Sequence, residues 1–134
     1  MKVCAENGDF LEIERAESEV DAYDIHLLVR VQFHGFSGEI ETWVLRAAWL
    51  GFAQDLGALE ERRQGEAKLE GTSPDELSLV IRSIDRAGHM GVEGTVGARG
   101  HNYNASLRVA VLAFDPSQLR ALVHEARVIA SHSS

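Results

Sequence analysis

The clearest pattern along the chain is an alternation of apolar and polar residues between positions 25 and 34. The apolar positions are Ile25, Leu27, Val29, Val31 and Phe33, the polar ones are His26, Arg30, Gln32 and His34, and Leu28 interrupts the polar face. Side chains of a β-strand point alternately to its two faces, so this period of two predicts a strand with one face in the core.

A return strand is expected after the turn that Gly35 and Gly38 bracket. Beyond this turn, Ile40 and Thr42 are expected to point inward, and Glu39, Glu41 and Trp43 outward. The segment therefore predicts a β-hairpin. Two shorter strands are predicted at 10–15 and 66–70, and a polar connection, 16–22, leads from the first of them to the hairpin. Charged residues in 10–15 are typical of an edge strand.

The hydrophobic period changes after the hairpin. The apolar residues Leu45, Trp49, Phe52, Leu56 and Leu59 are spaced by four, three, four and three positions. This spacing forms one stripe of a helix, which we expect to run from Leu45 to Arg63. Because glycine weakens a helix, Gly51 and Gly57 are expected either to allow close packing on the sheet or to mark a break.

The segment 75–114 follows a turn at Pro74 and predicts a three-stranded meander with strands at 76–85, 89–98 and 105–114. The inward positions are expected to be Leu77, Leu79 and Ile81, then Met90, Val92, Val96 and Ala98, then Leu107, Val109 and Val111. Glycine also recurs at every third position from Gly88 to Gly100, a period that does not match a strand. Without proline it cannot form collagen, and without a following helix it is no phosphate loop. We expect a twisted or bulged strand against which something packs closely.

The last element has clear starting signals. Asp115 is expected as N-cap, Pro116 at the first helical position, Gln118 as the capping-box partner, and Phe114 in contact with Leu119. An apolar stripe follows at Leu119, Leu122, Val123, Ala126 and Ile129. The helix should end at Ala130, and the tail 131–134 should fray.

These elements predict one α+β domain over residues 1–134. Strands and helices do not alternate as a parallel sheet requires, so we expect a single antiparallel β-sheet of six or seven meandering strands with two α-helices packed on one face. The core face should carry Ile25, Leu27, Val29, Val31, Leu79, Ile81, Val92, Val109 and Val111. An edge strand could pair with a second copy, so both a monomer and a homodimer are open.

Composition places the chain among ordinary globular proteins, with 45% hydrophobic and 25% charged residues. No apolar run approaches the roughly 20 residues of a membrane span, and no signal peptide is visible, so we expect a cytoplasmic protein. Cys4 is the single cysteine, which excludes an intramolecular disulfide and a cysteine-rich zinc site.

The net charge of −8 is concentrated near the start, where residues 1–24 hold eight acidic residues against Lys2 and Arg15, a balance of −6. This negative charge disfavours nucleic acid as a partner, because binding to its phosphates requires a basic surface. It suits a basic protein surface, although acidic surfaces also serve solubility alone.

No cofactor or metal is expected. Metal-ligand spacing is missing among the scattered histidines, which are His26, His34, His89, His101, His124 and His132. The turn serine Ser37 lacks the surroundings of a nucleophile elbow. We therefore expect a protein that is not an enzyme.

The outward face of the first hairpin is the candidate site. There His26, Arg30, Glu39, Glu41 and Trp43 should converge. A histidine and a carboxylate beside an aromatic residue could form an acid/base pair, but cross-strand charge pairing explains the same residues. An exposed tryptophan among charges also favours binding to a protein partner.

Several segments resemble the WapI-type immunity proteins of bacteria and related uncharacterised families: GFSGEIETWV, the helix from Trp49 to Leu59, GEAKLEG, LSLVIRSIDRAGHMGVEG and a last strand running into a helix. The likeness spans residues 25–125. In that family the last strand leads into an aspartate-rich turn with aromatic residues, and here Phe114-Asp115-Pro116 keeps the aspartate without the following aromatic. The resemblance implies a cytoplasmic protein that neutralises a toxin by binding it, and it brings no active-site residues.

The expected function is therefore that of a non-catalytic binding protein, an immunity-type inhibitor of a cognate bacterial toxin. The partner should be a protein with a basic surface, and neither nucleic acid nor a membrane. The alternative is a small-molecule-binding protein or enzyme with a pocket between sheet and helices.

Overall fold

The structure is a computed structural model that describes residues 1–16, 23–73 and 75–131. Three sequence-based expectations fall largely outside these residues. They are the polar connection beyond Ala16, the turn at Pro74 and the frayed tail beyond Ser131.

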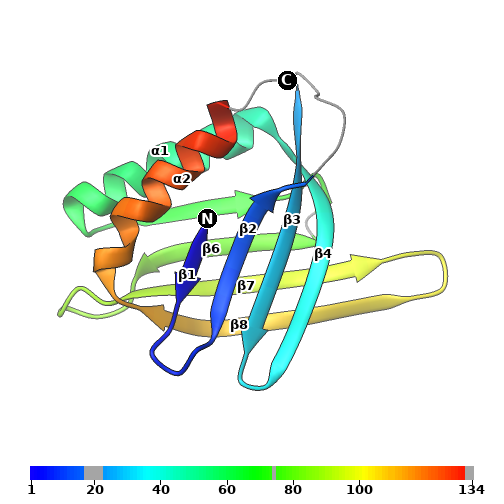
Figure 1. Ribbon diagram of the computed structural model, residues 1–134, viewed down its shortest axis with the longest axis horizontal. Helices are drawn as coiled ribbons and strands as arrows, with labels where there is room; N and C mark the ends of the chain where they lie inside the picture. The colour runs from blue at the N-terminus through cyan, green and yellow to red at the C-terminus, as the bar shows by residue number, and fades with distance from the viewer. Residues whose placement is uncertain (17–22, 74, 132–134) are drawn as a thin grey trace.

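The chain forms two four-stranded antiparallel sheets and two α-helices (Figure 1). The first sheet has the order β1-β2-β3-β4, with β1 at Lys2–Cys4, β2 at Phe10–Arg15, β3 at Asp24–Phe33 and β4 at Phe36–Leu45. The second has the order β5-β6-β7-β8, with β5 at Glu66–Glu70, β6 at Leu77–Ser83, β7 at Met90–Arg99 and β8 at Asn104–Phe114. The helices are α1, Arg46–Arg62, and α2, Leu119–Ser131, which the 3-10 turn η1, Pro116–Gln118, precedes.

The prediction of an α+β fold with antiparallel strands and two helices is confirmed, but the expected single sheet of six or seven strands is wrong. The β3–β4 hairpin and the β6–β7–β8 meander were foreseen, yet α1 separates the strands into two groups, and β5 pairs with β6 instead of extending the first sheet. The eighth strand, β1, is too short to show an alternation, since it buries only Val3. The strands of the first sheet cross those of the second steeply (Figure 1), and apolar residues of both sheets form one core.

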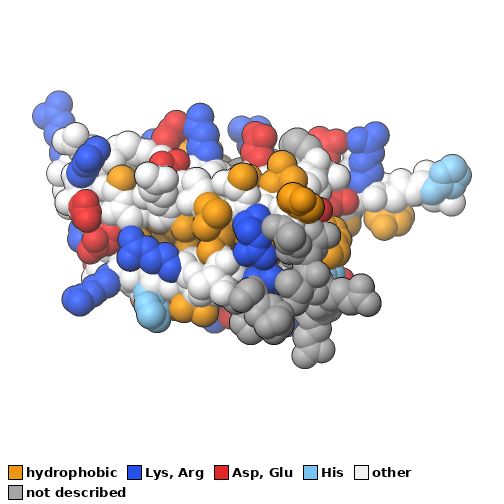
Figure 2. Space-filling view, turned by 90° about the horizontal axis from the view of Figure 1, so that it is seen from above, with side chains coloured by type: hydrophobic (Ala, Val, Ile, Leu, Met, Phe, Trp, Pro, Cys, Tyr) orange, Lys and Arg blue, Asp and Glu red, His pale blue; other side chains and the backbone are white. Residues whose placement is uncertain are grey.

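The helices lie together on one side of the two sheets (Figure 1). Helix α1 packs against β5 and α2, and Trp49 Nε1 donates a hydrogen bond to the Ala126 carbonyl at 2.9 Å. The end of α2 is tied to the first sheet, because Arg15 Nη1 donates to the Ile129 carbonyl at 2.7 Å. The helices therefore connect the two sheets instead of covering one face of a single sheet. Their outer side carries charges of both signs with apolar side chains between them (Figure 2).

Neither glycine of α1 breaks the helix. A Cβ on Gly57 would lie 3.2 Å from Arg127 of α2, so the close approach there is to the other helix and not to the sheet. Leu45 does not belong to the helical stripe, because it is the exposed last residue of β4. The start of the last helical segment is partly confirmed: Asp115 accepts from the Ser117 N–H at 2.8 Å, whereas the capping-box role of Gln118 is wrong. Its side-chain amide bonds Cys4 of β1 instead.

The irregularity expected in the glycine-rich strand β7 occurs in its pairing with β8, and the extra residue is on β8. A register shift between Val92 and Gly94 leaves two residues of β8, Ala110 and Val111, opposite Glu93. This bulge moves the following residues of β8 to the other phase, so Leu112 and Phe114 are buried. The prediction that Val111 points into the core is therefore wrong, and its side chain is 41% exposed.

Candidate binding face on the first hairpin

The five residues predicted for the site lie on one face of the β3–β4 hairpin. The register pairs His26 with Trp43, Leu28 with Glu41, and Arg30 with Glu39. The neighbouring strand β2 adds Glu12 and Glu14 to the same side, because both carboxylates contact Arg30. We call this surface, composed of Glu12, Glu14, His26, Arg30, Glu39, Glu41 and Trp43, the hairpin face.

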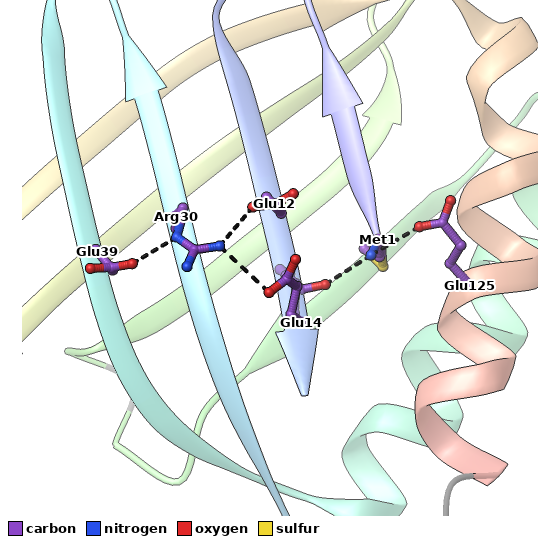
Figure 3. A network of polar contacts seen from close by, with 7 residues as sticks. Met1, Glu12, Glu14, Arg30, Glu39 and Glu125 are labelled. Atoms are coloured by element: carbon purple, nitrogen blue, oxygen red, sulfur yellow. Dashed lines mark hydrogen bonds and ion pairs between the residues drawn. The ribbon is translucent and has the colours of Figure 1, made fainter. Parts of the chain in front are cut away.

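Arg30 is at the centre of the hairpin face and connects three strands (Figure 3). Its Nε donates to Glu39 Oε1 at 2.7 Å, and its Nη1 lies 3.0 Å from Glu12 Oε1 and 3.5 Å from Glu14 Oε2. The hydrogen bond to Glu39, followed by that to Glu12, raises the pKa of Arg30 above its ordinary value. The guanidinium thus pairs with carboxylates of both β2 and β4.

A second pair occupies the other end of the face. The rings of His26 and Trp43 are stacked, with centroids 4.4 Å apart and planes 7° from parallel. The indole is still 38% exposed, whereas the other tryptophan, Trp49, is fully buried. The backbone of Trp43 is also fixed, because its carbonyl accepts from the Thr72 N–H at 2.8 Å. Trp43 therefore presents an exposed aromatic surface in a defined orientation.

The hairpin face is strongly acidic. Four carboxylates, from Glu12, Glu14, Glu39 and Glu41, accompany the guanidinium of Arg30, so the residues of this face carry a net charge of −3 when His26 is neutral. Of the other acids in the first quarter of the sequence, Glu17, Glu19 and Asp21 lie outside the described residues. The acidic first quarter of the sequence thus contributes at least the two carboxylates of β2 to the hairpin face.

Sequence reasoning placed the β2 glutamates on an edge strand, which is wrong because β2 lies between β1 and β3, and it did not assign them to the site. The pairing of β2 with β3 could not be inferred, although the alternation of Leu11 and Ile13 with Glu12 and Glu14 already showed that these carboxylates share one side. Once β2 lies beside β3, Glu12 is directly opposite Arg30. The central charge cluster follows from that register.

The acid/base alternative depends on His26 and Glu41, whose Nε2 and Oε2 atoms are 3.6 Å apart. The imidazole is largely covered, with its side chain 14% exposed, and Nδ1 is buried without a hydrogen-bond partner among the described residues. Cross-strand charge pairing accounts for Arg30 and Glu39, as the simpler interpretation held. His26 therefore contributes a ring that packs against one face of the Trp43 indole.

Hollows elsewhere differ in character. One of about 420 Å³ lies between α1 and α2, with Gln54, Arg127 and Ser131 as its polar side chains, and it is the nearest counterpart to the expected pocket between sheet and helices. A larger one, of about 580 Å³, borders the end of β8. Within the described ranges no three His, Cys, Asp or Glu residues gather as metal ligands would. Neither α1 nor α2 combines the length and apolarity that crossing a bilayer would take.

Comparison of the chain with protein-family models, with curated proteins and with solved structures gives no match.

Proposed function

We propose that this protein is a non-catalytic binding protein that uses its hairpin face to dock onto a basic surface of a protein partner. The observation that carries the proposal is the exposed Trp43, stacked on His26 at one end of a face whose other end carries Arg30 paired with Glu12, Glu14 and Glu39. Tryptophans of this kind are frequent anchors of protein interfaces.

The charge arrangement favours this use over solubility alone. Surface acids that only confer solubility need no shared partner, whereas here one guanidinium on β3 pairs with Glu12 and Glu14 of β2 and with Glu39 of β4. Ordered carboxylates reduce the entropy that binding must remove, and their uncompensated charge accelerates the encounter with a cationic partner. Both effects act on one surface with the aromatic anchor.

We further propose that the partner is a cationic toxin, such as a nuclease, which the protein neutralises in the cytoplasm. Two features support this proposal: the acidic hairpin face complements a surface that binds nucleic acid, and the sequence resembles bacterial immunity proteins. An inhibitor of this kind would occupy the basic surface that the toxin needs for its substrate.

Co-expression with the polypeptide encoded beside this chain tests the proposal. A complex that survives size-exclusion chromatography and weakens steeply as salt concentration rises is expected, because the interface is electrostatic. Trp43→Ala should weaken binding by about 2 kcal/mol or more, as truncation of an anchor does, and Glu41→Lys should reduce the association rate.

Matched controls come from exposed residues away from the hairpin face. Tyr103→Ala removes an exposed aromatic residue of the β7–β8 loop, and Glu61→Lys reverses an exposed charge near the end of α1. Each control should change the binding free energy by less than about 0.5 kcal/mol. A verified complex whose affinity is the same in Trp43→Ala, Glu41→Lys and the controls would exclude the hairpin face as the interface.

A further inference from the structure

The two sheets expose four edge strands, and three of them are protected against pairing with another chain. On β1, the Gln118 side chain accepts from the Cys4 N–H at 2.9 Å and donates to the Cys4 carbonyl at 2.8 Å, so an amide imitates the missing neighbour. On β4, the Trp43 carbonyl already accepts a hydrogen bond from the Thr72 N–H, and the charge of Glu39 discourages another strand from pairing. On β5, three of the five residues are charged, and α1 packs beside the strand.

The fourth edge, β8, has no comparable protection from the residues that the structure describes. It is 11 residues long, pairs only with β7 in the described sheet, and contains a single charged residue, Arg108. Natural proteins guard such edges with charges, short strands or covering segments, because unpaired backbone groups accept another strand. Among the described strands, β8 is therefore an edge that is open to an added strand.

A groove borders the end of this strand. The hollow of about 580 Å³ is lined by the consecutive residues Val111 to Phe114, by the turn residues Ala5 to Asn7 and by Phe33. Since successive strand residues point to opposite faces, a hollow that touches four in a row lies along the backbone edge of β8. Its volume is in the range of ligand-binding clefts.

The groove is acidic. The lining includes the carboxylates of Glu6, Asp9 and Asp115 and contains two histidines but no lysine or arginine among the described residues. A hydrogen bond from the His34 N–H lowers the pKa of Asp9, and one from the Ser117 N–H lowers that of Asp115, so both carry charge at neutral pH. The walls combine apolar side chains with negative charge, which suits a segment in which apolar and basic residues alternate.

We propose that this groove binds an extended, basic segment of a protein partner, which adds to β8 as a fifth strand of the second sheet. The lining from Val111 to Asp115 spans about 13 Å, four steps of ~3.3 Å, which is enough for a segment of about five residues. Backbone hydrogen bonds to β8 supply affinity, and alternate side chains contact the apolar wall and the carboxylates. The groove shares no residue with the hairpin face, so this site does not depend on the proposed function.

The test uses the unmodified protein and a capped peptide of about six residues in which Val and Lys alternate, with a Val/Glu peptide as control. Cys4 lines the groove and is exposed, so its alkylation by N-ethylmaleimide reports occupancy. At millimolar concentration the Lys peptide should slow alkylation several-fold and shift the backbone amide resonances of 111–114. Equal effects of both peptides, no effect, or shifts centred on Trp43 would overturn the proposal.

Methylated peptides test whether the segment pairs as a strand. In an added strand, alternate N–H groups face β8, so methylation of one alternate set of nitrogens should abolish binding while methylation of the other set preserves it. Equal binding by the two methylated Lys peptides would contradict strand addition.

A matched pair of variants tests whether the peptide binds in the groove. Ala113→Lys introduces a charge at the exposed rim of the groove, and Ala105→Lys makes the same change on the exposed distal part of β8. Ala113→Lys should abolish protection of Cys4, and Ala105→Lys should leave it unchanged. Equal behaviour of the two variants would refute this location. A dimer that fills the groove without peptide and that Ala113→Lys dissociates would identify a second copy of the chain as the occupant and overturn the proposal.

Discussion

The β3–β4 and β7–β8 hairpins have strands of similar length, but different features hold their strands in place. In β3–β4, inward and outward side chains alternate without interruption, and the outward ones form the charge and aromatic contacts of the hairpin face. In β7–β8, the pairing contains a bulge, and glycines of β7 lie where other backbone segments approach closely. Side-chain pattern determines the first hairpin, and backbone shape determines the second.

The two hairpins therefore suit different kinds of binding partner. The β3–β4 hairpin offers a surface of side chains, which suits docking of a folded partner, whereas β8 offers an edge of backbone groups, which suits an extended segment. The bulge contributes to the second case, because it turns Ala110 and Val111 outward just where the groove begins. Four predictions test the contrast between the hairpins, from the largest expected effect to the smallest.

Gly94→Ala should be the most destabilising small change in the second hairpin. Gly94 has φ +151°, and a Cβ there would collide with the Ser78 carbonyl oxygen and lie 2.9 Å from the Leu79 Cα. We expect a loss of about 3–5 kcal/mol in the free energy of unfolding, measured by urea denaturation. The control is Gly51→Ala on α1, where an added Cβ meets nothing within 4 Å, and there a gain of up to about 1 kcal/mol is expected. Similar small effects of both variants would show that backbone shape does not constrain β7.

Truncation of valines should reveal the phase change in β8. Val29 of β3 is fully buried and Val111 of β8 is 41% exposed, although the sequence pattern predicts both to be buried. Val29→Ala should cost about 2 kcal/mol of stability, and Val111→Ala less than about 1 kcal/mol. Thermal or urea unfolding distinguishes them. Equal losses would mean that the alternation continues through the bulge.

Removal of the central guanidinium should change the salt response of the first hairpin. Arg30→Met leaves four carboxylates on the hairpin face without a cation, so added salt should stabilise this variant by screening their repulsion. Arg108→Met on β8 is the control, and its melting temperature should follow the salt dependence of the unaltered protein. A variant Arg30→Met that salt does not stabilise would show that the carboxylates do not interact.

Asp9 links the β1–β2 turn to the β3–β4 turn, and we expect it to make a pH-dependent contribution to the stability of the fold. Its carboxylate accepts from the His34 N–H at 3.1 Å and from Asn7 Nδ2 at 3.0 Å, and the first of these bonds lowers its pKa below 3.8. The resulting stabilisation is complete above the unfolded-state pKa of 3.8 and is lost as pH falls through the lower folded value. Asp9→Asn should therefore lower the melting temperature at neutral pH, and the difference should shrink in acid. A difference that persists unchanged in acid would contradict this origin.

The sequence predicted the features that side-chain patterns determine and missed those that backbone shape determines. Period-two alternation located β3, β4 and the exposed side of Trp43, because side chains alone determine those positions. The sequence did not predict the phase of β8 after the bulge, since a register shift is a backbone event without a side-chain signal of its own. Gln118 was misassigned for a related reason: a distant partner, Cys4, competes for its amide more effectively than the local capping position.

The division into two sheets could not be predicted from the hydrophobic pattern either. Each hairpin is a local feature, whereas the arrangement of the sheets depends on contacts between distant segments. The assignment of β2 to the hairpin face shows the same limit, since Glu12 meets Arg30 only through the β2–β3 register. Candidate residues on one hairpin could thus be predicted, and the neighbours that order them could not.

The most direct measurement of the central claim is residue-resolved hydroxyl-radical oxidation of the protein, free and in complex with its partner. In the free protein Trp43 should be oxidised readily and Trp49 slowly, because the first is 38% exposed and the second is fully buried. If the hairpin face is the interface, complex formation should slow the oxidation of Trp43 several-fold and leave that of Tyr103, exposed on the β7–β8 loop, unchanged. An unchanged rate at Trp43 in a complex shown to be fully formed would contradict the claim.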